Sequence, residues 1–298
     1  RSWNADRRAT ASGFLDEPLA VLPAPQTIIE RLKRADLPVD NQRANVLWMD
    51  DALGALLDKL QEHGLDENTI IFFFNDHGQG AKGTLYQGGI HNPSIVWRKG
   101  GFSKQGTSRV RVSNIDFAPT ILDFANVACP ENLFDGTSFR SVLEGRTTQI
   151  HESLYFEMGF TRAVIKGKWK YLALRYPERA NRLSPDERAE ILKRFNAKQR
   201  EHSKRVVTTD PTSPFSHISL IPGGGGAEAA STGKQPGYYD PDQLYDLSRD
   251  PKEQRNLAKD PRFKQVLADM KSELRKYLDE LPGGFAELKP RQVGPEAR

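Results

Sequence analysis

Apolar residues in the first half of the chain follow helical spacing and then form a continuous run. Residues 41–63 have an apolar stripe with a period near 3.6, and Gly64 follows as a helix stop. A shorter stretch with the same period predicts a helix at Ile28–Lys33. The run "IIFFF" at 70–74 predicts a buried strand, because it is apolar on both faces like strands covered by helices. The stripe within 41–63 consists of Val46, Met49, Leu53, Leu56, Leu57 and Leu60.

A second strand and a further helix follow this run. The segment "PSIVWR" at 93–98 predicts the strand, and residues 113–127 predict a helix that begins at Asn114 or Asp116. Helices therefore alternate with strands. This alternation predicts an α/β sheet with helices on its faces.

The pattern changes after about residue 150. The segments "SLYFEM", "TRAVIKGKWKYLAL" and "DQLYDL" predict short strands of an antiparallel sheet. A last helix is predicted to begin at Asp260-Pro261. We therefore expect a second, smaller α+β subdomain at 151–282. The apolar stripe of the last helix is Val266, Leu267, Met270, Leu274, Tyr277 and Leu278.

A charged helix and a loop interrupt this subdomain. Ser184 as a cap, Pro185 at the first helical position and Glu187 as the capping-box partner predict a helix at 184–205. The Gly-, Ser- and Pro-rich stretch that follows predicts a flexible, exposed insertion near 206–237. We expect the tail at 283–298 to be disordered.

Composition narrows the class of protein only modestly. The chain has 298 residues, 37% of them hydrophobic, and a net charge of +4 with 43 basic and 39 acidic residues interspersed. No block of like charge predicts a nucleic-acid partner, and no apolar run reaches the ~18 residues of a membrane span. The single cysteine, Cys129, excludes an internal disulfide and a multi-cysteine zinc site.

Candidate chemistry gathers in "NDHGQGAKGTLYQGG" at 75–89, directly after the predicted strand. Ligands of open α/β sheets lie at the carboxyl ends of strands. Asp76 and His77 supply oxygen and nitrogen ligands for a metal, and Lys82 supplies a positive charge for an anion. The plainer alternative is a turn in which Asp76 and His77 bond their own backbone and Lys82 is solvated.

Six segments in series resemble the sulfatase family of the alkaline phosphatase superfamily. The similarity runs from about residue 41 to 280 in family order. It implies an α/β fold that is part of the alkaline-phosphatase-like parallel-sheet sandwich, followed by a smaller C-terminal antiparallel sheet plus helix. Residues 1–150 would be the C-terminal part of the α/β catalytic domain. The segments are "NVLWMDDALGALLDKLQEHGLDENTIIFFFNDHG", "KGTLYQGGIHNPSIVW", "VSNIDFAPTILDFANV", "DGTSFRSVLEGR", "KWKYL" and "QLYDLSRDPKEQRNLA".

The resemblance implies roles for single residues. Asp76 and His77 would bind the divalent cation, which is usually Ca²⁺ in sulfatases, although a histidine ligand leaves Mn²⁺ or Zn²⁺ open. Lys82 would contact the sulfate oxygens and stabilise charge on the transferring group. His91 lies where the family often has Arg, and we treat it as a weak candidate for a substrate contact. Tyr86 is expected to serve packing.

The nucleophile of the family is not recognisable in the sequence. Sulfatases use a formylglycine made from Cys or Ser in a Cys/Ser-x-Pro-x-Arg motif. Cys129 is followed by "PENLF", and Ile95 stands where the motif that "HNPSI" would form needs Arg. We therefore expect this chain to be the C-terminal portion of a sulfatase, without sulfatase activity of its own. Lacking the N-terminal strands, the strand at 70–74 would expose an edge and an apolar face.

Three other functions stay open at this point. A phosphodiesterase or phosphonate monoester hydrolase of the same superfamily would share the Asp-His turn and the lysine loop. A non-catalytic binding protein would keep the fold, and a fragment would have no function of its own. The expected substrate is a small-molecule or saccharide sulfate ester, and family habit places the full-length protein in the periplasm or outside the cell.

Overall fold

In the computed structural model, two compact units make up the chain. One unit comprises Arg1–Phe72 and Val96–Phe102, and the other comprises Phe73–Ile95 and Ser103–Arg298. The structure describes residues 9–10, 13–14, 23–24, 26–78, 80–103, 105–130, 133–204, 206–218, 231, 233–282 and 284–285.

Two helices form the core of the first unit. The predicted short helix is confirmed as α1 (Thr27–Arg34), and the predicted long helix as α2 (Asn41–Glu62). The Asp40 side chain caps α2 by accepting the backbone N–H of Arg43. Both guanidinium nitrogens of Arg31 donate to the carboxylate of Asp51, at 2.6 and 2.7 Å, and join the two helices. The buried residues between the helices are Ile28, Leu32 and Ala44, with Leu47 and Trp48 packed against them.

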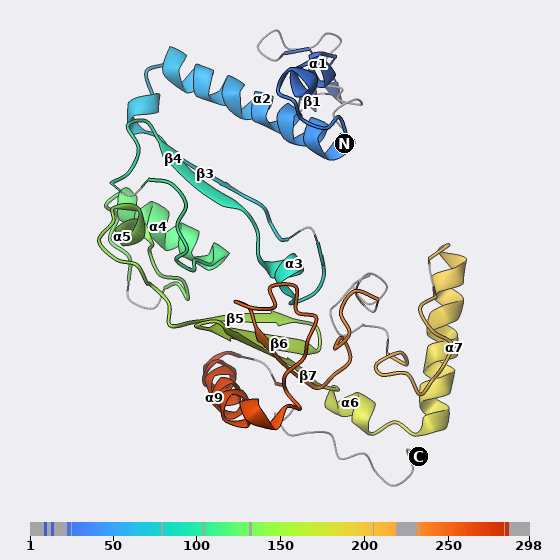
Figure 1. Ribbon diagram of the computed structural model, residues 1–298. Coiled ribbons are helices and arrows are strands. Elements are labelled where there is room, and N and C mark those ends of the chain that lie inside the picture. The colour runs from blue at the N-terminus through green and yellow to red at the C-terminus, as the bar shows by residue number, and fades with distance from the viewer. Residues whose placement is uncertain are drawn as a thin grey trace. The chain divides into compact units, whose positions relative to one another are not determined.

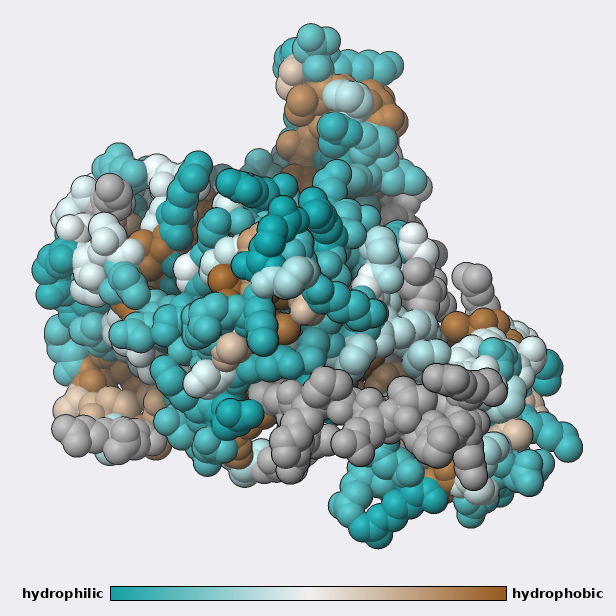
Figure 2. Space-filling model, turned by 60° about the horizontal axis from the view of Figure 1, so that its bottom comes forward, coloured by the Kyte–Doolittle hydropathy of each residue, from teal (hydrophilic) through white to brown (hydrophobic). Residues whose placement is uncertain are grey.

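The apolar stripe of α2 lies mostly at the surface. Ala44 is the one residue of α2 that is buried, whereas Val46, Met49 and Leu56 are 55%, 43% and 51% exposed. Within the described residues of the first unit, the amphipathic face of α2 is therefore largely uncovered. One face of the molecule, drawn in Figure 2, shows apolar patches between hydrophilic side chains.

Two short strands flank the loop at 75–93 that carries the candidate residues. β3 (Ile70–Phe74) and β4 (Ser94–Arg98) are hydrogen-bonded neighbours in a two-stranded sheet, as the sequence predicted for their positions. The apolar run predicted a buried strand at 70–74, and the lack of N-terminal strands predicted that part of its apolar surface is exposed; the structure shows partial burial. Phe74 is 43% exposed although its ring contacts Phe117 at 4.5 Å between centroids. Two more strands of two residues, β1 (Ala9–Thr10) and β2 (Gly13–Phe14), pair with each other.

A four-stranded antiparallel sheet is the centre of the second unit, as predicted (Figure 1). Its order is β5 (Ser153–Met158), β6 (Thr161–Lys166), β7 (Trp169–Leu174) and β8 (Asp242–Asp246). Each strand pairs with the next one along the chain, and a long connection joins β7 to β8. Alternate residues point to opposite faces, so the sheet has two apolar faces to bury.

Helix α9 (Lys264–Glu280) covers one face of this sheet (Figure 1), and residues 81–86 cover the other. On the face that α9 covers, the whole predicted apolar stripe of the helix packs in a hydrophobic cluster with Val164, Tyr171 and Leu244. On the opposite face, a second hydrophobic cluster contains Ala81, Leu85 and Tyr86 of the loop. They pack with Ala163 and Leu172, which are paired across β6 and β7. The segment that carries the candidate chemistry is thus part of the core of the C-terminal sheet.

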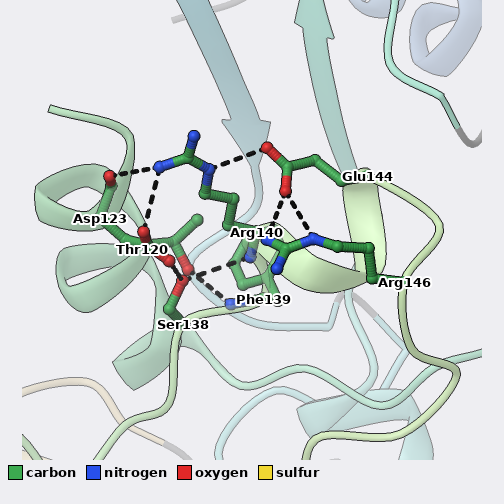
Figure 3. Close-up of polar contacts among 7 residues, drawn as sticks. All are labelled: Thr120, Asp123, Ser138, Phe139, Arg140, Glu144 and Arg146. Atoms are coloured by element: carbon green, nitrogen blue, oxygen red, sulfur yellow. Dashed lines mark hydrogen bonds and ion pairs between the residues drawn. The ribbon is translucent and has the colours of Figure 1, made fainter. Parts of the chain in front are cut away.

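The predicted helix at 113–127 is a 3₁₀ turn at Asn114–Asp116 followed by α4 (Phe117–Phe124). Polar contacts join α4 to α5 (Arg140–Leu143), as Figure 3 shows. Arg140 donates to the backbone carbonyl of Asp123 at 2.7 Å and to the Glu144 carboxylate at 2.8 Å. The Thr120 hydroxyl accepts the backbone N–H of residue 139 at 3.0 Å. Two segments that resemble sulfatase motifs are therefore packed together here.

One prediction for the charged insertion is confirmed, and another is wrong. α7 (Pro185–Glu201) begins at the predicted Ser184/Glu187 capping box, after the short α6 (Glu178–Asn181). The expectation of an exposed insertion is wrong for residues 215–218, whose side chains are buried. Phe215 and Ile218 pack with Leu174 and Ala180. Residues 219–230 and 232 lie outside the described residues, as do 283 and 286–298 of the predicted tail.

In the part of the chain that the structure describes, no helix is both long and apolar enough to cross a membrane.

Candidate functional site

The candidate residues lie on a loop between β3 and β4 that is closed by its own backbone. The N–H of Asn75 donates to the carbonyl of Pro93 at 3.3 Å, and the side-chain amide of Asn92 donates to the carbonyl of Asn75 at 2.5 Å. Further along, the N–H of Gly78 donates to the carbonyl of Gly89 at 2.8 Å. These bonds fold residues 75–93 back on themselves, with the short helix α3 (Gln87–Ile90) in the returning limb (Figure 1).

Two glycines permit this close approach. A Cβ on Gly78 would lie 2.3 Å from the carbonyl oxygen of Gly88, and a Cβ on Gly89 would lie 2.4 Å from that of Thr84. No side chain fits at such distances, so the tight closure of the loop depends on glycine at both positions. The glycines serve the approach of one limb of the loop to the other.

Asp76 and His77 are brought together at the carboxyl end of β3. The Asp76 side chain is 82% exposed, and its Oδ2 lies 3.5 Å from Nε2 of His77, which is 24% exposed. Nδ1 of His77 lies 2.9 Å from the backbone carbonyl of Gly78. A carbonyl only accepts, so Nδ1 is the nitrogen that donates to Gly78, and Nε2 is the nitrogen that faces Asp76. Metal-binding histidines are commonly oriented by such a bond.

Lys82 and His91 are exposed on the same loop. The ammonium of Lys82 has no carboxylate partner among the residues that the structure describes, and Gly83 after it adopts a positive φ of 80°. His91 ends α3, and its backbone N–H donates to the carbonyl of Gln87 at 2.9 Å. Among the described residues, no contact links the His91 side chain to Asp76 or His77. Lys82 is therefore available for an anion, and the role of His91 stays a prediction.

Tyr86 packs, as expected from the sequence. Its side chain is 2% exposed, and its hydroxyl donates to Oε1 of Gln243 at 2.8 Å. Tyr245 donates to the same oxygen at 2.9 Å. Burial raises the pKa of Tyr86, so the phenol stays protonated at neutral pH. A buried, bonded phenol of this kind supports the loop and is not a reactive group.

Two further buried residues that the sequence reasoning missed support the same loop. Oε2 of Glu253 accepts the backbone N–H of Gln87 at 2.5 Å, and Oε1 of Glu253 lies 2.5 Å from the ammonium of Lys170. Lys170 is 0% and Glu253 1% exposed. Both residues lie in segments that resemble sulfatase motifs, "KWKYL" and "QLYDLSRDPKEQRNLA". The motifs do not show where the two side chains lie, because that depends on the fold.

The described residues include two candidate metal ligands. Asp76 and His77 offer a carboxylate oxygen and an imidazole nitrogen, which fits Mn²⁺ or Zn²⁺ as well as Ca²⁺. Across the described parts of the chain, no group of three or more His, Cys, Asp or Glu is arranged to hold a metal. The Asp-His pair would thus need ligands from outside these residues. A hollow of about 180 Å³ on α7 is lined by other residues, Ala189, Leu192, Lys193, Asn196, Arg200, Thr209 and Pro211.

The chain is similar to known sulfatases. Residues 10–127 match the model of the sulfatase family. The chain is 26% identical to an ulvan-active sulfatase of Formosa agariphila over 246 residues, which cover 78% of the chain and 37% of that protein. It is 34% identical to an arylsulfatase of Hemicentrotus pulcherrimus over 143 residues, which cover 42% of the chain and 26% of the relative.

Solved structures confirm the fold class. A structure in complex with its substrate D-glucosamine-2-N,6-O-disulfate superposes with a TM-score of 0.53 at 19% identity, over 85% of this chain and 45% of that one. At this identity the likeness shows the α/β fold with its small antiparallel sheet, and not the substrate. The chain spans about a quarter to a half of the length of the sulfatase relatives that it matches.

Proposed function

We propose that this chain supplies the metal- and sulfate-binding loop of an enzyme that hydrolyses sulfate esters. The arrangement of Asp76 and His77 carries the proposal. Nε2 of His77 faces the Asp76 carboxylate because the Gly78 carbonyl holds the other ring nitrogen. An oxygen and a nitrogen donor at the end of a strand suit a divalent cation. Ca²⁺ is the cation that the sulfatase relationship favours, with Mn²⁺ or Zn²⁺ as alternatives.

Lys82 would bind the sulfate group. Its ammonium is exposed on the loop five residues after His77. A positive charge near the sulfuryl oxygens stabilises the charge that develops as the ester bond breaks. A formylglycine hydrate would supply the attacking oxygen, and no residue of this sequence fits its motif. Asp76, His77 and Lys82 would therefore complete a site whose nucleophile lies outside these 298 residues.

A sulfated saccharide is the substrate class that the relatives support. One relative acts on ulvan by its name, and the human relative, N-sulphoglucosamine sulphohydrolase, is 27% identical over 82% of this chain and 48% of its own length. One structural neighbour holds a disulfated glucosamine. We therefore infer that the ester lies on a saccharide.

Turnover of three ester classes by the protein expressed from its complete gene tests this proposal. Sulfate esters should be hydrolysed faster than phosphate or phosphonate esters. Lys82→Ala should lower the sulfate rate by about 10²- to 10³-fold, the range found when one group that stabilises the transition state is removed. Lys193→Ala, an exposed lysine on α7, is the matched control and should leave the rate unchanged. Faster phosphonate or phosphate turnover would reject the sulfatase assignment.

Sequencing the coding DNA upstream of Arg1 tests the nucleophile separately. An in-frame Cys-x-Pro-x-Arg or Ser-x-Pro-x-Arg motif would support the proposal. A gene without either motif would argue for a binding protein or an inactive fragment.

A further inference from the structure

A buried ion pair connects β7 to the loop that carries Asp76, His77 and Lys82. The ammonium of Lys170 lies 2.5 Å from Oε1 of Glu253, and the other carboxylate oxygen, Oε2, accepts the N–H of Gln87 at 2.5 Å. Both charged side chains are at most 1% exposed. One carboxylate thus joins a strand of the C-terminal sheet to the first residue of α3.

The contact reaches the candidate residues through the backbone of the loop. Gln87 is followed directly by Gly88 and Gly89, whose carbonyls accept the N–H groups of Gly80, Ala81 and Gly78 at 2.8 to 3.0 Å. Gly78 follows His77 immediately, and its own carbonyl holds Nδ1 of that histidine. A displacement of α3 would therefore move the backbone on which Asp76 and His77 lie.

The need for stability alone does not account for this pair. Burial of two charges carries a desolvation cost, and apolar residues of similar volume often stabilise a protein as well or better. Burial indeed lowers the pKa of Lys170, against the opposing effect of Glu253. Glu253 also has a φ of 57°, in the left-handed region that side chains other than glycine seldom adopt. Backbone strain of this kind is concentrated at functional sites.

We propose that Glu253, paired with Lys170, is a positioning residue that fixes the loop carrying the metal- and sulfate-binding side chains. The inference rests on the proposed function of that loop. Glu253 acts through the N–H of Gln87 and touches neither metal nor ester. The C-terminal sheet then has a role in the site, because β7 supplies the cation that keeps this carboxylate paired.

Three variants of the 298-residue chain separate positioning from stability. Lys170→Met/Glu253→Leu removes both charges and the acceptor for the Gln87 N–H. Lys170→Met/Glu253→Gln removes both charges but keeps an acceptor oxygen, and it is the matched control. Gln87→Pro removes the donor and leaves Lys170 and Glu253 in place. Proline is tolerated there because Gln87 is the first residue of α3 and Tyr86 before it is extended, with ψ of 159°.

Amide hydrogen exchange, followed by mass spectrometry on peptides from 75–91, is the primary measurement. In Gln87→Pro and in the leucine double variant we expect exchange in this loop to become about tenfold faster or more, since a charge-assisted bond is lost. The β5–β6 hairpin of the same molecules should exchange as in the wild type. The glutamine double variant should keep wild-type protection in the loop. Mn²⁺ affinity, measured by electron paramagnetic resonance, should fall in the first two variants and recover in the third.

Wild-type exchange of the loop in both Gln87→Pro and the leucine double variant would overturn the proposal. So would equally accelerated exchange of the loop in all three variants. If the leucine double variant fails to fold, Gln87→Pro and the glutamine double variant still decide the question. Failure of the proposed function would show in the turnover of the protein expressed from its complete gene, whereas the exchange experiment tests the role of Glu253 independently.

Discussion

The hydroxyl of Tyr86 donates a 2.8 Å hydrogen bond to the side-chain carbonyl oxygen of Gln243, 157 residues further along the chain. Tyr86→Phe keeps the buried ring but leaves this oxygen with Tyr245 as its remaining hydroxyl donor. We expect a loss of about 1 kcal/mol in the free energy of unfolding, measured by urea denaturation. Tyr155→Phe is the control, because its hydroxyl bonds the exposed Glu157 and its loss should cost less than about 0.5 kcal/mol. Equal losses in the two variants would show that the bond to Gln243 contributes no more to the free energy of unfolding than the exposed bond to Glu157.

Alanine at Gly78 and at Gly54 should have opposite effects on stability. A Cβ on Gly78 would collide with the Gly88 carbonyl at 2.3 Å, whereas a Cβ on Gly54, inside α2, would meet no atom within 4 Å. Gly54→Ala should therefore raise the free energy of unfolding by about 0.5–1 kcal/mol through helix propensity. Gly78→Ala should lower it by about 1–3 kcal/mol, the usual cost of inserting atoms into packed structure. Thermal unfolding of the two variants measures both, and a stabilised Gly78→Ala would contradict the closed loop.

Glu273 should make the C-terminal unit sensitive to acid. Its burial opposes ionisation, but hydrogen bonds from Lys166, Ser153 and Lys276 outweigh the burial and lower the pKa of Glu273 to about 2. The folded-state pKa lies below the unfolded value of about 4.3, so the stabilisation is complete above that value and is lost as pH falls toward 2. We expect it to be on the order of 1–2 kcal/mol.

Denaturant unfolding between pH 6 and pH 2.5 tests this dependence. Glu273→Gln should be less stable than the wild type at pH 6, and the difference should shrink as the pH approaches 2.5. Glu190→Gln on the exposed surface of α7 serves as the control and should track the wild type. A pH-independent difference would mean that the glutamate is not ionised in the folded protein.

The uncovered stripe of α2 should promote association of the isolated chain. Met49→Glu/Leu56→Glu places charges at positions that are 43% and 51% exposed in the wild type. We expect sedimentation to show less self-association, with the free energy of unfolding changed by no more than about 0.5 kcal/mol. Leu32→Ala, at a position 3% exposed, should instead cost about 2–5 kcal/mol. Association that persists in the double variant would place the contact elsewhere, for example on the exposed Ile95 and Trp97 of β4.

Local patterns predicted most of the elements. The capping box of Ser184 and Glu187, the stop at Gly64 and the apolar stripe of α9 all lie where the sequence placed them. Such signals are local, because helix caps and periodicity depend on residues a few positions apart. The degree of burial of the strand at 70–74 is not encoded in its apolar run, because the run does not say which segments cover it. The buried segment 215–218 was missed for a similar reason, because its composition resembles that of an exposed loop.

By itself the sequence determined the helices, the antiparallel strands, the sulfatase relationship and the loop on which Asp76, His77 and Lys82 lie, because each is encoded over short stretches. Only the tertiary structure decided which nitrogen of His77 faces Asp76, and that Glu253 holds the loop from 166 residues away. The physical reason is that a buried carboxylate takes whichever donors the fold brings within hydrogen-bonding distance. That proximity depends on how β7, β8 and α3 pack together, and no spacing along the chain encodes it.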